Sequence, residues 1–244
     1  MKASRSAPSS ITDAVATRDS GGHVHAAGGR VALVAGASGL VGRALLARLC
    51  ADPGVARVHA LVRRPLDVAL PTLDAQIVDF ADLPALPRCD EAYLALGTTI
   101  AVAGSREAFR AVDFDANLAV ARAALAAGAR RIGLVSAMGA DARSRVFYSR
   151  TKGELEDALS ALPLDALVIA RPSLLLGDRA PLGQPRRRGE HIASLADRWL
   201  RPLLPARLRG IAAQDVAAAL ATAVPRASGR VVLDSARMQG AAST

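Results

Sequence analysis

Tyr148 and Lys152 are four residues apart in the segment Tyr-Ser-Arg-Thr-Lys. On a helix this spacing puts the phenol and the ammonium on the same face, one turn apart. A neighbouring ammonium favours the phenolate, so the tyrosine can pass a proton to a carbonyl oxygen. Arginine would serve less well, because its guanidinium is larger and its charge more delocalised. Lys152 is one of only two lysines among 31 basic residues, which indicates that arginine could not replace it.

Ser136 ends an apolar run that predicts a strand at residues 130–136. Ligands bind at the carboxyl edge of a parallel sheet, and there a serine hydroxyl can donate a hydrogen bond to a substrate oxygen. A lone serine could simply end the strand, but with the downstream tyrosine and lysine it completes a predicted catalytic set of Ser136, Tyr148 and Lys152. Asn117 could support a proton relay through water, an assignment that the sequence leaves open.

A glycine-rich turn follows the first predicted strand and precedes a predicted helix. In such a turn Gly36 allows a tight bend, Gly39 lets the backbone approach a pyrophosphate, and Gly42 lets helix and strand pack closely. The helix N-terminus then faces the negative charge of the phosphates. A turn without a ligand is the alternative, but the position after the first strand favours a dinucleotide. The predicted cofactor contacts here are Gly36, Ser38, Gly39, Leu40, Val41 and Gly42.

Arg63 and Arg64 follow the second predicted strand, about 20 residues beyond these glycines. An acidic residue at this point would bind the ribose hydroxyl of NAD, whereas two guanidinium groups can bind a 2′-phosphate. The pair predicts a preference for NADP(H), with a solvated arginine pair as the alternative. Asp79 and Phe80 are predicted to border the adenine, although Asp79 could equally just end its strand.

These candidate residues lie at the ends of alternating strands and helices, which predict a doubly wound parallel sheet with helices on both faces. The fold class is therefore α/β, a Rossmann-type domain over residues 30–244 with a small C-terminal substrate lobe at about 173–210. Residues 1–29 predict a disordered tail. The predicted strands are 30–35, 57–62, 75–79, 91–96, 130–136, 165–170 and 230–234, and the predicted helices are 40–50, 105–127, 148–162, 192–200 and 213–224.

The composition excludes several classes of protein. Hydrophobic residues make up 51% of the 244 residues and charged residues 22%, as in a globular domain. No uncharged apolar run reaches the roughly 18 residues that a membrane-spanning helix needs, and the N-terminus lacks the apolar region of a secretory signal. Cys50 and Cys89 show no pairing or ligand spacing, so no metal site is predicted. Unpaired thiols indicate a reducing compartment, and we expect a cytoplasmic protein.

The net charge of +9 would attract nucleic acid. However, nearly all of the basic residues are arginine throughout the chain, as a coding bias would produce. Arg186, Arg187 and Arg188 form the one dense basic run, and no aromatic side chain that could stack on a base lies nearby. We therefore predict no nucleic-acid partner.

The glycine turn, Ser136 and the Tyr148–Lys152 pair together resemble the short-chain dehydrogenase/reductase superfamily, over about residues 31–224. The segments 96–99, 135–141, 148–154, 171–173 and 177–179 resemble its atypical subgroup, which includes the Tat-interacting oxidoreductase-like protein. The resemblance implies NADPH binding, with Leu96, Gly97 and Thr98 as a wall beside the nicotinamide. Ala35 and Ala137 depart from the family pattern, because each lacks a hydroxyl that relatives carry.

The sequence thus predicts an NADP(H)-dependent oxidoreductase that reduces a small carbonyl substrate. Tyr148 would donate the proton, Lys152 would hold the nicotinamide ribose and Ser136 would orient the carbonyl. The alternative is a non-enzymatic NADPH-binding regulatory protein that acts through a protein partner. The two long alanine-rich helices are compatible with a homodimer.

Overall fold

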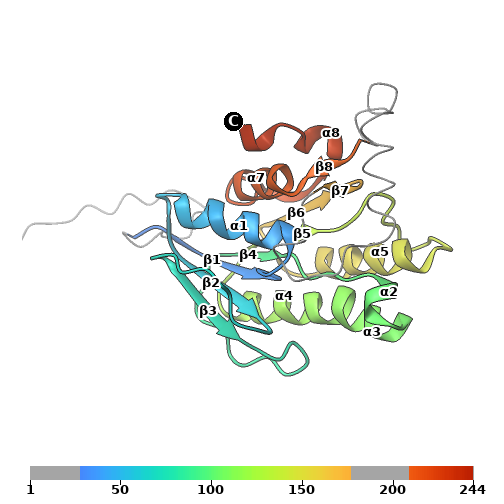
Figure 1. The fold of residues 1–244 in the computed structure, drawn as a ribbon, viewed down its shortest axis with the longest axis horizontal. Coiled ribbons are helices and arrows are strands. Elements are labelled where there is room, and N and C mark those ends of the chain that lie inside the picture. Colours follow the sequence, from blue (N-terminus) through green and yellow to red (C-terminus); the bar gives the residue numbers. More distant parts are fainter. Residues whose placement is uncertain (1–27, 177–208, 244) are drawn as a thin grey trace, which may run out of the picture.

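The computed structural model describes residues 28–176 and 209–243. Its centre is a seven-stranded sheet in the order β3-β2-β1-β4-β5-β6-β9, and all neighbouring strands are parallel (Figure 1). The strand order reverses between β1 and β4, which is where doubly wound folds bind their ligands. The predicted fold class is therefore confirmed. The strands are β1 (Arg30–Ala35), β2 (Val55–Val62), β3 (Leu73–Ile77), β4 (Glu91–Leu94), β5 (Arg131–Val135), β6 (Ala166–Arg171) and β9 (Gly229–Asp234).

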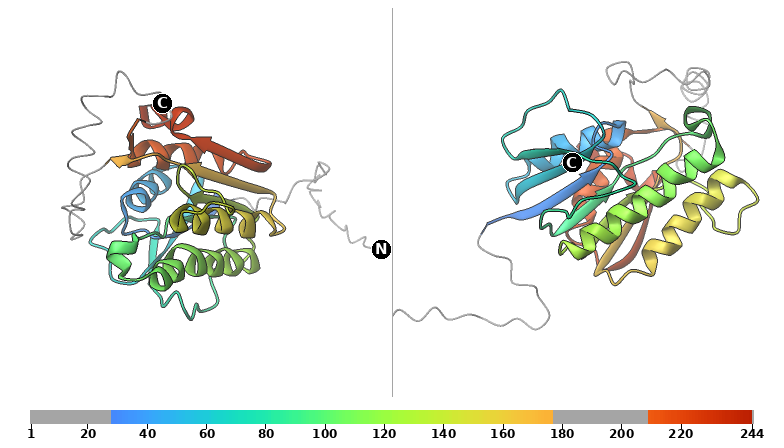
Figure 2. Two further views of the ribbon diagram at one scale, coloured as in Figure 1. Left: turned by 90° about the vertical axis from the view of Figure 1, so that its right-hand side faces the viewer. Right: turned by 90° about the horizontal axis from the view of Figure 1, so that it is seen from below.

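Helices cover both faces of this sheet (Figures 1 and 2). Helices α1 (Leu40–Ala51) and α7 (Ala213–Ala223) pack together on one face, and α4 (Asn117–Ala126) and α5 (Phe147–Ser160) lie on the other. Each face buries its own aliphatic cluster. Helix α1 contributes Val41, Leu45 and Leu49, whose spacing of four residues forms a single apolar stripe.

The predicted helix at residues 105–127 differs most from the structure. In its place stand α3 (Arg106–Arg110), a π-helical turn η1 (Ala111–Ala116) and α4, preceded by a short α2 (Ile100–Ala103). Local propensity favours one continuous α-helix here. A π-helical turn holds one more residue than an α-helical turn, and we attribute it to the tertiary contacts of Asp113 and Asn117.

The third and fourth strands end earlier than predicted. Strand β3 ends at Ile77 because the chain turns soon afterwards, where the Asp79 carboxylate accepts a hydrogen bond from the Ala81 N–H. Strand β4 ends at Leu94, just before the chain passes Gly36. Both differences lie at the edge of the sheet where the candidate site forms.

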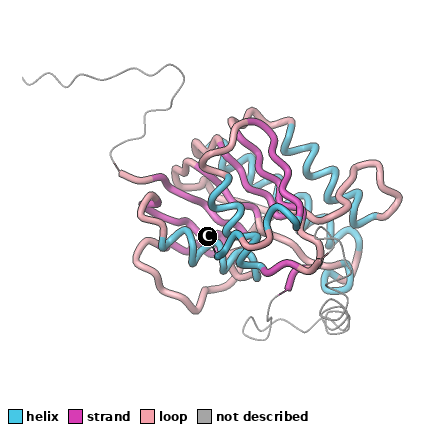
Figure 3. Tube along the Cα trace, turned by 90° about the horizontal axis from the view of Figure 1, so that it is seen from above, coloured by secondary structure: helices cyan, strands magenta, loops and turns pink. Residues whose placement is uncertain are grey.

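The C-terminal part adds a two-stranded pair, β7 (Leu175–Leu176) with β8 (Ile211–Ala212), which is labelled in Figure 1. The short helices α8 (Ser235–Met238) and η4 (Ala241–Ser243) follow, and Figure 3 shows helical segments next to the C-terminus. The predicted tail, the predicted loop with Arg186–Arg188 and the predicted helix at 192–200 lie wholly or mostly outside the described residues, so the domain boundaries stay predictions. None of the described helices combines the length and apolar character needed to cross a membrane.

The amino ends of β1 and β4 hold a buried network around Glu91, which is 1% exposed. Its Oε1 accepts hydrogen bonds from Arg30 Nε and from the Tyr93 hydroxyl, both at 3.0 Å, and Arg30 also pairs with Asp52. Burial raises the pKa of Glu91, while Arg30 lowers it. Burial also raises the pKa of Tyr93 well above its usual value. Each of these four side chains therefore has a polar partner inside the protein.

Candidate cofactor-binding and catalytic site

The glycine turn after β1 is required by close backbone contacts. Gly36 has φ +84°, and a Cβ there would lie 2.4 Å from the Ala95 carbonyl oxygen. A Cβ on Gly42 would lie 2.1 Å from the Gly36 carbonyl oxygen. The predicted roles of these two residues, a tight bend and close helix packing, match these contacts. The turn therefore brings the start of α1 close to the loop after β4.

The N-terminus of α1 is open to an anion. Gly39 is the N-cap and provides no side-chain cap, and the first turn contains no acidic residue. The first N–H groups of a helix have no partner within the helix, and the helix dipole adds positive potential there. A Cβ on Gly39 would meet only the Gly36 carbonyl oxygen, at 3.3 Å, so the backbone is accessible from its outer side. Ser38 beside it is exposed.

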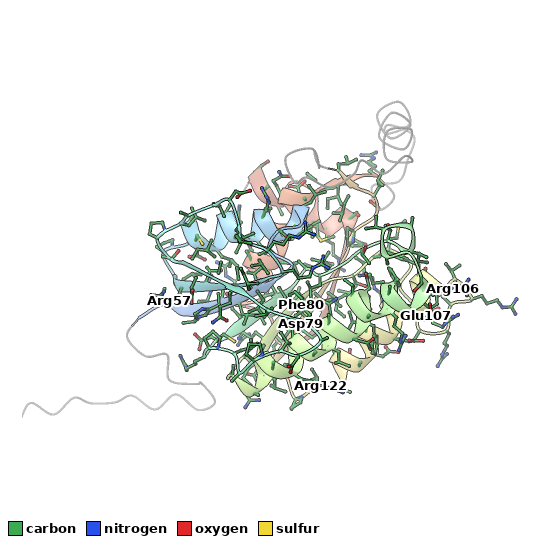
Figure 4. All side chains as sticks on the ribbon, turned by 60° about the horizontal axis from the view of Figure 1, so that its bottom comes forward. Arg57, Asp79, Phe80, Arg106, Glu107 and Arg122 are labelled. Carbon is green, nitrogen blue, oxygen red and sulfur yellow. The ribbon has the colours of Figure 1, made fainter. Side chains whose placement is uncertain are left out.

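Arg63 and Arg64 directly follow β2, the strand next to β1, and both are exposed. Within the described part of the chain neither makes an ion pair or a hydrogen bond. Their guanidinium groups are therefore available to a ligand at the carboxyl edge of the sheet. Asp79 is exposed and Phe80 half-buried on the loop after β3 (Figure 4). The predicted contact of this pair with adenine stays a prediction.

Tyr148 lies at the start of α5, and its ring packs against the buried Phe109 ring with 5.5 Å between centroids. Tyr148 is half-buried, and its hydroxyl forms no hydrogen bond with any described residue. Lys152 follows one turn later and is 4% exposed. Its Nζ lies 2.7 Å from Asp113 Oδ1. The phenol is thus open to a ligand, whereas the ammonium is held by the protein.

The loop after β4 runs beside Lys152. A Cβ built on Gly97 would lie 4.0 Å from Lys152 Nζ and 3.5 Å from Asp113 Oδ1. The Thr98 N–H donates to Asp113 Oδ2 at 2.8 Å, and Asn117 Nδ2 donates to the Leu96 carbonyl at 3.2 Å. The predicted wall of Leu96, Gly97 and Thr98 therefore stands next to the predicted catalytic lysine.

Asp113 is a site residue that the sequence analysis did not find. It lies on η1 and is 1% exposed. Asp113 and Asn117 are four residues apart, and Ala121 and Ala124 continue the same buried stripe. Polar residues in an apolar stripe indicate specific partners inside the protein, because burying a polar group without a partner costs free energy of folding. That interruption was the available signal.

Ser136 has a different partner from the one predicted. Its hydroxyl donates to Glu156 Oε1 at 2.5 Å, and Glu156 is 1% exposed. Arg171 binds both Glu156 oxygens, at 3.0 and 2.6 Å. No hydrogen bond joins Ser136 to Tyr148 in the described structure. A contact with a substrate oxygen would require the hydroxyl to turn away from Glu156, and this role stays a prediction.

Comparison with protein families gives a match over residues 36–226 to a family described as NAD(P)H-binding. The chain is 35% identical to the mitochondrial FMP52 protein of Candida albicans over 192 residues, which cover 75% of this chain and 82% of that protein. It is 39% identical to mitochondrial FMP52 of Eremothecium gossypii over 153 residues, covering 61% and 67%.

Two solved structures share the fold. One is an oxidoreductase of the short-chain dehydrogenase/reductase family from Burkholderia thailandensis, with a TM-score of 0.61 and 21% identity over 87% of this chain and 94% of that one. The other is the Bordetella bronchiseptica enzyme WbmF in complex with NAD⁺, with a TM-score of 0.61 and 17% identity over 86% and 76%. At these identities the likeness shows the fold alone.

The prediction of a cytoplasmic protein is wrong, because the curated relatives are named mitochondrial proteins. The prediction rested on two unpaired cysteines, Cys50 and Cys89, and both are free thiols in the structure. Free thiols indicate a reducing environment but do not distinguish one reducing compartment from another.

Proposed function

This chain belongs to the NAD(P)H-binding family, as an atypical short-chain dehydrogenase/reductase, and from that premise we propose that it is an NADP(H)-dependent reductase of a small carbonyl compound. The observation that carries the proposal is the Tyr148 hydroxyl, which no residue of 28–176 or 209–243 binds and which comes from a residue one helical turn before Lys152. Both residues lie at the edge of the sheet where the glycine turn and the start of α1 are open to an anion.

The residues present fit the cofactor. The first turn of α1, from Leu40 to Gly42, would bind the pyrophosphate through its N–H groups. Arg63 and Arg64 would bind the 2′-phosphate, because both are exposed and neither has a partner in the part of the chain that the structure describes. A bidentate, charge-assisted contact of this kind supports a preference for NADP(H) over NAD(H). When bound, the nicotinamide supplies the hydride.

Tyr148 supplies the proton in the proposed reaction. Its Oη donates to the carbonyl oxygen as that oxygen gains negative charge, and solvent returns a proton to the phenolate afterwards. Lys152, one turn later on α5, would hold the nicotinamide ribose. The Tyr148 ring packs against the buried Phe109 ring, which limits the movement of the phenol.

The first experiment compares binding of NADPH and NADH by cofactor fluorescence in the wild type and in the charge-reversed variant Arg63→Glu/Arg64→Glu. We expect the variant to bind NADPH about 10 to 100 times more weakly and NADH almost unchanged, because only the 2′-phosphate contact is lost. The matched control is Arg57→Glu/Arg122→Glu, which makes the same charge change at two exposed arginines elsewhere (Figure 4).

The same preparation is then tested for NADPH oxidation with a panel of aldehydes and ketones. Equal affinity of the wild type for the two cofactors would overturn the NADP(H) preference. Tight NADPH binding without turnover of any carbonyl compound would overturn the reductase proposal in favour of the NADPH-binding regulatory protein.

A further inference from the structure

Asp113 contacts two parts of the candidate site at once. One carboxylate oxygen lies 2.7 Å from Lys152 Nζ on α5, and the other accepts the Thr98 N–H at 2.8 Å in the loop after β4. Asp113 and Lys152 side chains are 1% and 5% exposed, so water barely screens the pair. The carboxylate therefore links the catalytic helix to the loop predicted to wall the nicotinamide.

The π-helical turn carries Asp113 to this position. η1 spans Ala111–Ala116, and Asn117 Nδ2 donates to the carbonyls of Val112, Asp113 and Leu96 at 3.2 Å each. The first two bonds stabilise the turn from within, and the third ties it to the loop after β4. Single π-helical turns inside helices are rare and frequent at functional sites, which supports a role for this one.

We propose that Asp113 is a positioning residue of the cofactor site, which holds the Lys152 ammonium and the Thr98 turn in place before the cofactor binds. The proposal rests on the proposed function only in assigning Lys152 to the cofactor. The other titratable groups near Lys152 on α5 are Tyr148, one turn earlier, and Glu156, one turn later. Glu156 is engaged by Arg171, so Asp113 is the anion that pairs with Lys152.

The first test uses the cofactor-free protein. Because the chain has only two lysines, acetylation of Lys152 can be measured by mass spectrometry with Lys2 as the internal standard. In Asp113→Asn the ammonium is no longer held in the ion pair, and we expect Lys152 to be acetylated about tenfold faster relative to Lys2. Asparagine retains an acceptor for the Thr98 N–H, so the loop keeps its hydrogen bond.

The matched control is Asp115→Asn, which removes an exposed carboxylate from the same turn. It should leave the acetylation ratio of wild type unchanged. We also expect Asp113→Asn to weaken NADPH binding about tenfold, since a lysine that is not preorganised must be ordered on binding. A purely structural role would change the melting temperature but neither of these ratios, measured well below it. Wild-type values of both ratios in Asp113→Asn would overturn the proposal.

A double-mutant cycle covers the case in which Asp113→Asn folds but is too unstable for the first test. Either Asp113→Asn or Lys152→Met leaves one buried charge unpaired, whereas the double variant leaves none. We expect the double variant to melt above both single variants, and strictly additive losses would overturn the proposal. A protein without carbonyl turnover but with a reactive Lys152 in Asp113→Asn would contradict the proposed function alone, so the two failures are distinguishable.

Discussion

The two tyrosines of this chain lie in opposite surroundings at the two ends of the sheet. Tyr93 is fully buried, and its hydroxyl donates to Glu91 within the network at the amino ends of β1 and β4. Tyr148 lies beyond the carboxyl end of β5 and is half-buried, with a hydroxyl that no described residue binds. The polar side chains of the amino-end network bind one another. At the carboxyl end, a phenol, two arginines and a helix N-terminus are accessible to a ligand.

Comparison of the two ends indicates which buried charges belong to a functional site. Both ends contain an ion pair with a buried carboxylate, Arg30 with Glu91 at one and Lys152 with Asp113 at the other. A buried pair is by itself weak evidence for a site, because it can serve only the fold. The carboxyl end differs because it also carries Tyr148, Arg63 and Arg64, whose side-chain polar groups have no hydrogen-bond partner among the described residues.

The largest expected effect comes from removing the two hydroxyls in turn. Tyr148→Phe should lower turnover of a carbonyl substrate by about 100-fold or more, because the proton donor is lost, while NADPH affinity stays nearly intact. Tyr93→Phe should keep turnover and lose about 1 kcal/mol of stability, because a buried hydrogen bond is lost. Steady-state kinetics and urea denaturation measure the two effects, and equal turnover in both variants would remove Tyr148 from the mechanism.

A smaller effect separates two glycines with positive φ, Gly36 at the carboxyl end (+84°) and Gly229 at the amino end (+66°). Alanine at Gly229 should cost about 1 kcal/mol for its left-handed backbone alone, since a Cβ there meets nothing within 4 Å. Alanine at Gly36 should cost more and also weaken NADPH binding, because its Cβ would overlap the Ala95 carbonyl. Denaturant titration and cofactor fluorescence test the pair, and unchanged NADPH binding by Gly36→Ala would argue against the turn as the cofactor site.

The smallest effect is a pH dependence of folding stability at the amino ends of β1 and β4. Burial raises the pKa of Glu91 above its unfolded value of 4.5. Its contribution to stability is therefore full below that value and is lost as pH rises through the folded pKa. We compare the free energy of unfolding of wild type with that of Glu91→Gln. The advantage of wild type should shrink as pH rises from about 4 to about 8, by about 1 kcal/mol for each unit by which the folded pKa of Glu91 exceeds its unfolded pKa.

Asp52 provides the contrast for this measurement. Burial raises its pKa, but hydrogen bonds from the Gly54 N–H and Arg30 outweigh burial and lower it below 3.8. Its contribution is present above that unfolded value and is lost as pH falls, so Asp52→Asn should show the opposite slope. The same slope in both variants would contradict this account of the amino-end network.

Much of the fold was predictable because its signals are local. The strand at 30–35 matches β1 in full, and the glycine spacing located the turn that Gly36 and Gly42 require. The Tyr148–Lys152 pair was predictable for the same reason, since its four-residue spacing is realised within one helix, α5.

The failures arose where distant contacts decide the outcome. The π-helical turn at 111–116 is stabilised by Asn117 reaching Leu96, a residue that lies 21 positions earlier in the chain. No local pattern encodes such a contact. The partner of Ser136 was missed in the same way, because Glu156 comes into reach only when α5 packs against the sheet.

Residue patterns alone predict the order of strands and helices, the glycine turn and a tyrosine and a lysine on one helix face. These follow from backbone conformation and periodicity, which act over a few residues. The hydrogen-bond and ion-pair partners of the polar side chains depend instead on tertiary packing. Ser136 binds Glu156, Lys152 pairs with Asp113 and Tyr93 binds Glu91, whereas no described residue binds the Tyr148 hydroxyl. Partners of this kind depend on which side chains the packing of α5 and the β4 loop brings together, and hydrogen bonds reach only about 3 Å.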